Sequence, residues 1–162
     1  MNFQDRLQQA IQQGQKRAQA KDQAAKAKAL SAEELKRLHN EHRLALSDHI
    51  EKCVAAMANQ FPGFEVETLY GETGWGAAAK RDDAGARRGS GRSNFYSRLE
   101  VTVRPVSSAF IVEINAKGTI RNKEVFARKH FQKVADVDVE QFNELIDAWV
   151  LEYADLFAAN GS

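Results

Sequence analysis

Arginines set among glycines and serines are the first residues in this sequence whose types and spacing could recognise a ligand. Arg87, Arg88 and Arg92 lie in a stretch without large apolar residues. Guanidinium groups donate paired hydrogen bonds to phosphate oxygens, and glycines let the backbone follow a charged polymer. Basic residues of the expected strands would extend this candidate surface, namely Arg98, Arg104 and Arg128.

Three aromatic residues are candidates for stacking on a nucleic-acid base. Sequence alternation places Tyr96 and Phe126 on the face of the expected sheet opposite its core, and Trp75 lies in a glycine-rich segment. The simpler explanation is a solvated basic loop and a tryptophan folded over the edge of the core. No RRM signature, zinc-finger spacing or P-loop supports a specific nucleic-acid or nucleotide site.

Histidine and cysteine side chains form the second candidate group. His49 and Cys53 are four residues apart on an expected helix and could share a zinc ion. A closed zinc site needs four ligands, and the sequence offers only His130 beyond the histidines of this helix. We therefore expect no metal and no cofactor, with His42 and His49 at the margin of the core and His39 in solvent.

Catalytic residues are not predicted. Cys53 lies in a helical apolar stripe, where cysteine behaves as a small buried hydrophobic residue. Glu65 and Glu67 could pair as acid and base on one strand face, but outward acidic residues more simply protect an edge strand from aggregation. The nucleophile-elbow and zinc-protease motifs are both missing from the sequence. Binding without catalysis is the expected activity.

Helices must position the first of these residues. Residues 2–30 are rich in Gln, Ala and Lys and predict an extended helical arm. Its thin apolar stripe begins with Phe3, Leu7 and Ile11. The capping box Ser31-Ala32-Glu33-Glu34 predicts a second helix from about Ala32 to residue 60, and the alternative is one long bent helix over 2–60.

Alternating apolar residues predict the sheet. Four strands are expected, near residues 64–70, 95–103, 110–116 and 125–131. The short links between the later strands favour antiparallel hairpins. In the fourth strand the alternation directs Val125, Ala127 and Phe131 towards the core. Residues 71–94 read as a long flexible Gly/Arg-rich loop, and the alternative is that its part around Trp75 to Lys80 extends the first strand.

The last helix carries the broadest apolar face of the chain. It opens at the capping residue Asp138, and Trp149 lies at the centre of its apolar stripe. The predicted fold is α+β, with a four-stranded antiparallel sheet, helices on one face and an extended N-terminal helical arm. The predicted division is an arm over residues 1–30 and a single α+β domain over 31–162.

Charge is balanced overall but unevenly distributed along the chain. The sequence holds 23 basic and 22 acidic residues. Residues 74–134 carry thirteen Lys or Arg against five Asp or Glu, a net charge of +8, whereas residues 135–162 carry seven acidic residues and no Lys or Arg. This asymmetry favours a binding surface for an acidic partner.

The expected function is therefore that of a protein-interaction or adaptor module acting through the arm and the open sheet face. Its N-terminal helix would contact another protein or a second copy of the chain. The alternative is a nucleic-acid-binding module that holds RNA or DNA with the Gly/Arg-rich loop and the basic strands. A single cysteine, the lack of a signal-peptide pattern and the lack of an apolar run of about 20 residues predict a cytoplasmic protein without a membrane span.

Overall fold

The computed structural model describes residues 2–87 and 91–160, with side chains described outside 27–30 and 84–93. The chain divides into two compact units, residues 1–37 and residues 38–162. Helix α1, Phe3–Asn59, begins in the first unit and ends in the second. In the first unit every residue from Asn2 to Lys26 is exposed, except Gly14, which is half-buried.

Helix α1 is continuous through the capping box, so the alternative of one long helix is confirmed. No proline or glycine lies between Gly14 and Pro62, and alanine, lysine and glutamate are strong helix formers. The serine and glutamates of the capping box therefore continue a helix that nothing interrupts. The helix ends just before Pro62, where Gly63 takes a φ of 97° that other residues rarely adopt.

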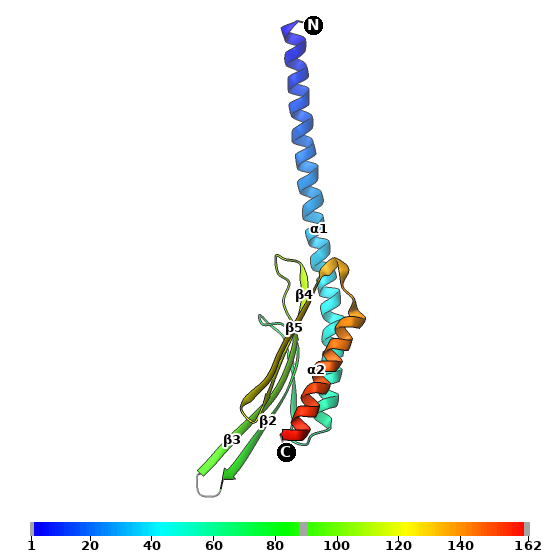
Figure 1. Ribbon diagram of the computed structural model, residues 1–162. Coiled ribbons are helices and arrows are strands. Elements are labelled where there is room, and N and C mark those ends of the chain that lie inside the picture. The colour runs from blue at the N-terminus through cyan, green and yellow to red at the C-terminus, as the bar shows by residue number, and fades with distance from the viewer. Residues whose placement is uncertain (1, 88–90, 161–162) are drawn as a thin grey trace. The chain divides into compact units, whose positions relative to one another are not determined.

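The residues described in the second unit form an antiparallel sheet in the order β1-β2-β3-β4-β5. Figure 1 shows that α2 and the C-terminal part of α1 lie on the same side of this sheet. The strands are β1 Glu65–Leu69, β2 Trp75–Arg87, β3 Gly91–Val103, β4 Ile111–Ile120 and β5 Lys123–Lys133. A 3-10 turn, η1 Val134–Asp136, leads into α2, Val139–Asn160. The α+β class and the antiparallel sheet are thus as expected.

The sheet has five strands, and the expected count of four is wrong. The additional strand is β2, inside the segment that we expected to be a loop. It pairs with β3 from Trp75 opposite Val103 to Arg87 opposite Gly91. Alanine and glycine have low strand propensity, so β2 carries no alternating apolar signal. The buried run Ala77-Ala78-Ala79 instead gives the small side chains that close packing requires.

The faces of β3 and β4 agree with the sequence pattern. Leu99, Val101 and Val103 of β3 are fully buried, as are Val112 and Ile114 of β4. They pack beneath an apolar side of α2, whose buried residues are Phe142, Ile146, Trp149, Val150, Tyr153 and Phe157. The strong amphipathic pattern of the last helix therefore located its core face correctly.

The face assigned to β5 is wrong by one residue. Phe126 is buried beside Tyr153, with ring centroids 6.4 Å apart, whereas Phe131 is 59% exposed. Gly118 lies opposite Phe126, and a Cβ at Gly118 would overlap the Phe126 ring. Apolar residues occur on both faces of this strand, and a one-residue slip reverses every side chain. The register shift between Gly118 and Thr119 adds to this ambiguity.

Phe61 and Phe64 close one end of the core against α2. Their rings lie 4.8 and 4.9 Å from the Phe157 ring in edge-to-face geometry. The Tyr153 hydroxyl donates a 2.8 Å hydrogen bond to the Thr119 carbonyl, which ties α2 to β4.

Within the described part of the chain, neither helix has the apolar length that crossing a membrane would require.

Candidate binding face of the sheet

The side of the sheet away from the two helices is called the open face here. Strand pairing aligns Glu100 of β3 with Lys117 of β4, and Lys117 with Ala127 of β5. The neighbouring row joins Thr102, Asn115 and Lys129. These rows place polar side chains from three strands side by side on one surface.

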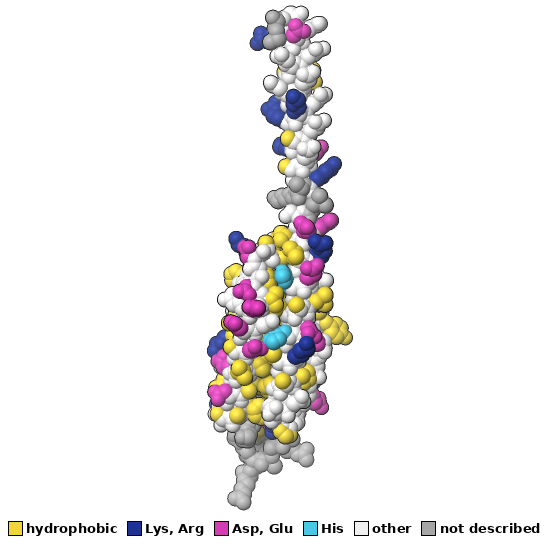
Figure 2. All heavy atoms as spheres, turned by 90° about the vertical axis from the view of Figure 1, so that its right-hand side faces the viewer, with side chains coloured by type: hydrophobic (Ala, Val, Ile, Leu, Met, Phe, Trp, Pro, Cys, Tyr) yellow, Lys and Arg dark blue, Asp and Glu magenta, His cyan; other side chains and the backbone are white. Residues whose placement is uncertain are grey.

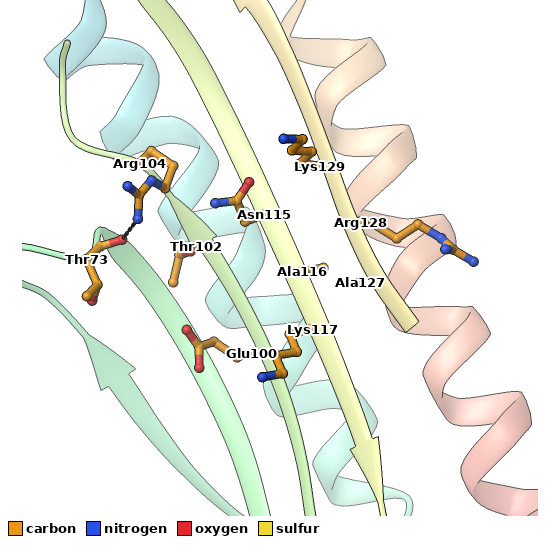
Figure 3. A pocket seen from close by; sticks show the side chains of 10 residues that line it. All are labelled: Thr73, Glu100, Thr102, Arg104, Asn115, Ala116, Lys117, Ala127, Arg128 and Lys129. Carbon is orange, nitrogen blue, oxygen red and sulfur yellow. Dashed lines mark hydrogen bonds between the residues drawn. The ribbon is translucent and has the colours of Figure 1, made fainter. Parts of the chain in front are cut away.

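A hollow of about 560 Å³ lies in this part of the open face. Figure 3 shows its lining, which comes from β3, β4, β5 and the loop before β2. The lining also includes buried Thr102 and the small side chain of Ala127. Among the lining residues, those that carry charge or hydrogen-bonding groups include Glu100, Thr102, Arg104, Asn115, Lys117 and Lys129.

Asn115 provides an unused acceptor in the hollow. Its Oδ1 atom is buried and has no hydrogen-bond partner within the described residues. A buried polar atom without a partner costs about 1–3 kcal/mol relative to one that is satisfied. Because this atom is buried, a ligand donor could meet it only after the Asn115 side chain rotates towards the hollow.

The two arginines described on the open face already have anionic partners. Arg98 donates to Glu67 at 2.8 Å and to Glu100 at 3.2 Å. The bond from Arg98 lowers the pKa of Glu67 below its usual value. Arg104 donates to the Thr73 carbonyl, and its Nε lies 3.7 Å from Glu113.

Lys117 and Lys129 differ from these arginines. Neither has a carboxylate within 4.0 Å among the residues whose side chains are described. Both line the hollow and both are exposed. Among the described residues, the lining of this hollow thus includes two ammonium groups without an ionic partner and one amide oxygen without a hydrogen-bond partner.

The predicted arginine candidates do not form one surface. Arg98 and Arg104 do lie on the open face. Arg128 instead extends towards α2, where it donates to Glu152 at 2.7 Å, and Figure 3 shows its side chain turned away from the hollow. The side chains of Arg87, Arg88 and Arg92 lie outside the described residues.

The predicted aromatic candidates are also separated. Phe126 is buried under α2, so its placement on the open face is wrong. Trp75 is half-buried against α1, with the Arg43 guanidinium carbon 4.4 Å from its ring centroid. Tyr96 is half-exposed in β3. Sequence reasoning missed Phe131, which is exposed on the open face between Lys129 and Lys133.

His39 is another correction. It is only 3% exposed, whereas the sequence placed it in solvent. Burial is the largest effect and lowers the pKa of His39 below its usual value. A backbone contact with Arg104 raises this pKa, and the nearby charges of Arg43 and His42 lower it by smaller amounts. Its position one turn before His42 gave no signal that the sheet would cover it.

His49 and Cys53 face each other as their spacing suggested, and α2 adds Asp147 to them. Burial and then the bond to Asp147 raise the pKa of the Cys53 thiol to about 12, which opposes a nucleophilic role at neutral pH.

No known family model, curated protein or solved structure matches this chain.

Proposed function

We propose that this protein is a protein-binding module whose open sheet face takes an acidic segment of a partner. The hollow with the unpaired Lys117 and Lys129 is the observation that carries this proposal. Carboxylates of the partner would bind the two ammonium groups, and rotation of the Asn115 side chain would let its Oδ1 accept from a donor of the partner. Exposed Phe131 lies on the same face and offers apolar contact beside the charges.

A protein partner fits the charge pattern better than a nucleic acid. Binding to a phosphate backbone depends on uncompensated basic residues. Arg98 and Arg104 are instead engaged by carboxylates, and Glu67, Glu100 and Glu113 share the face with them. Such a surface suits a partner whose acidic side chains lie opposite Lys117 and Lys129 and away from these glutamates, because like charges placed opposite each other cost affinity. RNA or DNA binding remains the alternative function.

The N-terminal helix supports a second contact of the same module, with another protein or a second copy of the chain. Phe3, Leu7 and Ile11 succeed one another at four-residue steps and are 75%, 47% and 52% exposed. Residues at this spacing share one side of a helix. Burying such side chains stabilises a complex by about 1.5–3 kcal/mol each. Leu7→Lys should abolish any concentration-dependent increase in mass seen by analytical ultracentrifugation.

The choice between protein and nucleic acid can be tested by fluorescence anisotropy. The probes are a labelled oligoglutamate peptide with one central phenylalanine and a labelled single-stranded oligonucleotide of similar charge. The double variant Lys117→Glu/Lys129→Glu should lose peptide binding. The control Lys52→Glu/Lys123→Glu makes the same change in net charge away from the hollow and should retain it.

Tighter binding of the oligonucleotide, with equal losses in both double variants, would favour the nucleic-acid alternative. Peptide binding that survives Lys117→Glu/Lys129→Glu would contradict the proposed site.

A cytoplasmic setting belongs to the same proposal, since the only cysteine, Cys53, is a free thiol and suits a reducing compartment.

A further inference from the structure

Three potential metal ligands converge between the two helices, on the side of the sheet opposite the open face. His49 and Cys53 come from α1 and Asp147 from α2. His49 Nε2 lies 2.7 Å from Asp147 Oδ1 and 3.4 Å from Cys53 Sγ. Cys53 Sγ lies 3.2 Å from the same Asp147 oxygen. Each residue therefore directs one ligand atom to a common point.

This geometry differs from that of a catalytic cysteine with a histidine base. In such a relay the histidine uses one ring nitrogen for the nucleophile and the other for the carboxylate. Here Nε2 of His49 meets both Cys53 and Asp147. A shared nitrogen cannot pass a proton between them in relay fashion.

The three separations instead resemble the edges of a coordination tetrahedron. Zinc bonds of about 2.0–2.3 Å to nitrogen, oxygen and sulfur place neighbouring ligand atoms roughly 3.3–3.7 Å apart. The His49–Cys53 edge, at 3.4 Å, already lies in this range, and the Cys53–Asp147 edge, at 3.2 Å, must lengthen slightly. The His49–Asp147 edge must open by about half an ångström, which a partly exposed carboxylate can supply by rotation.

We propose that His49, Cys53 and Asp147 form a site for a divalent transition-metal ion, with zinc as the best match. Thiolate, imidazole and carboxylate are all ligands that zinc accepts. Binding would replace the thiol hydrogen of Cys53, and that proton would leave to solvent. With neutral His49 and ionised Asp147, two anionic ligands would balance the charge of the ion.

A fourth ligand would come from solvent. Zinc sites with three protein ligands keep one position for water or another small ligand. The side chains of His49 and Asp147 are 30% and 51% exposed, so water can reach the ion. Figure 2 views this helical side, where histidine, acidic and apolar side chains share the surface.

An apolar groove of about 390 Å³ adjoins the proposed metal site. Cys53 and Asp147 form part of its lining, together with Met57, Val150 and Leu151. The solvent position on the ion would thus lie near a surface that can hold an apolar group. A metal at this place would also tie α1 to α2 across the helical layer.

The test uses the full-length protein, freed of metal and kept reduced. Zinc binding is measured by competition with a chromophoric chelator, and cobalt binding by its absorption spectrum. The proposal predicts one zinc per chain and a cobalt spectrum with tetrahedral bands and a thiolate charge-transfer band. Cys53→Ser should remove the charge-transfer band, because no other cysteine is present.

His49→Gln, Cys53→Ser and Asp147→Asn should each weaken zinc binding by at least about tenfold, since each removes one ligand of a three-residue set. His42→Gln and Asp48→Asn are matched controls on α1 and should change affinity by less than about twofold, because neither removes a ligand. Circular dichroism of every variant separates loss of the ligand from loss of the fold. Zinc binding that is absent, or equally strong in the folded ligand variants and the controls, would overturn the proposal.

Discussion

The orientation of β5 determines which residues face a partner, and a pair of identical substitutions tests it. Phe126 and Phe131 lie on the same strand, and the structure places them on opposite faces at 5% and 59% exposure. Phe126→Ala removes a ring packed beside Tyr153 and should destabilise the protein by about 3–5 kcal/mol. Phe131→Ala removes a mainly solvated ring and should cost less than about 1 kcal/mol.

Urea unfolding followed by circular dichroism measures both losses, with equal m-values as the check that unfolding remains comparable. A third variant makes the assignment specific. Gly118→Ala should cost about 1–3 kcal/mol through overlap with the Phe126 ring. The same change should cost less in the Phe126→Ala background, because the closest overlap is gone, while the Tyr153 ring carbon 2.9 Å from the added Cβ keeps part of the cost. Equal losses for Phe126→Ala and Phe131→Ala, or a larger loss for Phe131→Ala, would refute the strand orientation and with it the composition of the open face.

Three further predictions concern the core and its pH response. Trp149→Ala should cost about 3–5 kcal/mol in urea unfolding because Trp149 is only 7% exposed, and a loss below about 1 kcal/mol would contradict the packing of α2. Tyr153→Phe should cost about 0.5–1.5 kcal/mol in the same assay through loss of the bond to the Thr119 carbonyl, and an unchanged stability would place that hydroxyl in solvent. His39 has a pKa lowered by burial, so the unfolded state binds its proton more readily and stability falls as pH drops below about 6.5. His39→Gln should therefore lose less stability than the wild type between about pH 7.5 and pH 5.5, and equal losses would show that His39 titrates freely.

Strong periodicity allowed much of this fold to be predicted from the sequence. The apolar face of α2 and the alternating residues of β3 and β4 were assigned correctly because large side chains gather on one side of each element. The end of α1 followed from Pro62 and Gly63. These signals are local, and each depends on residues within a few turns or steps of one another.

The errors arose where local signals are weak or contradictory. Strand β2 has only small or charged residues after Trp75, so its position depends on pairing with β3 rather than on its own residues. Strand β5 has apolar side chains on both faces, so its pattern could not decide whether Phe126 or Phe131 is buried.

The candidate sites required long-range information. Lys117 and Lys129 become neighbours of Asn115 only through the register of three strands. Asp147 reaches Cys53 from 94 residues away, which no spacing rule on α1 could reveal. Sequence reasoning could identify the types of residue present, whereas tertiary packing decided which of them meet.

Photo-crosslinking inside the cells that make this protein tests the proposed binding face most directly. A photoreactive amino acid replaces Ala127 in the hollow, and in a control it replaces exposed Ala45 on α1. The protein-binding proposal predicts a discrete protein adduct at position 127 that survives nuclease treatment, disappears in Lys117→Glu/Lys129→Glu and does not form at position 45. A position-127 variant that yields no protein adduct, a nuclease-sensitive adduct, or one that persists after both lysines are reversed would contradict it.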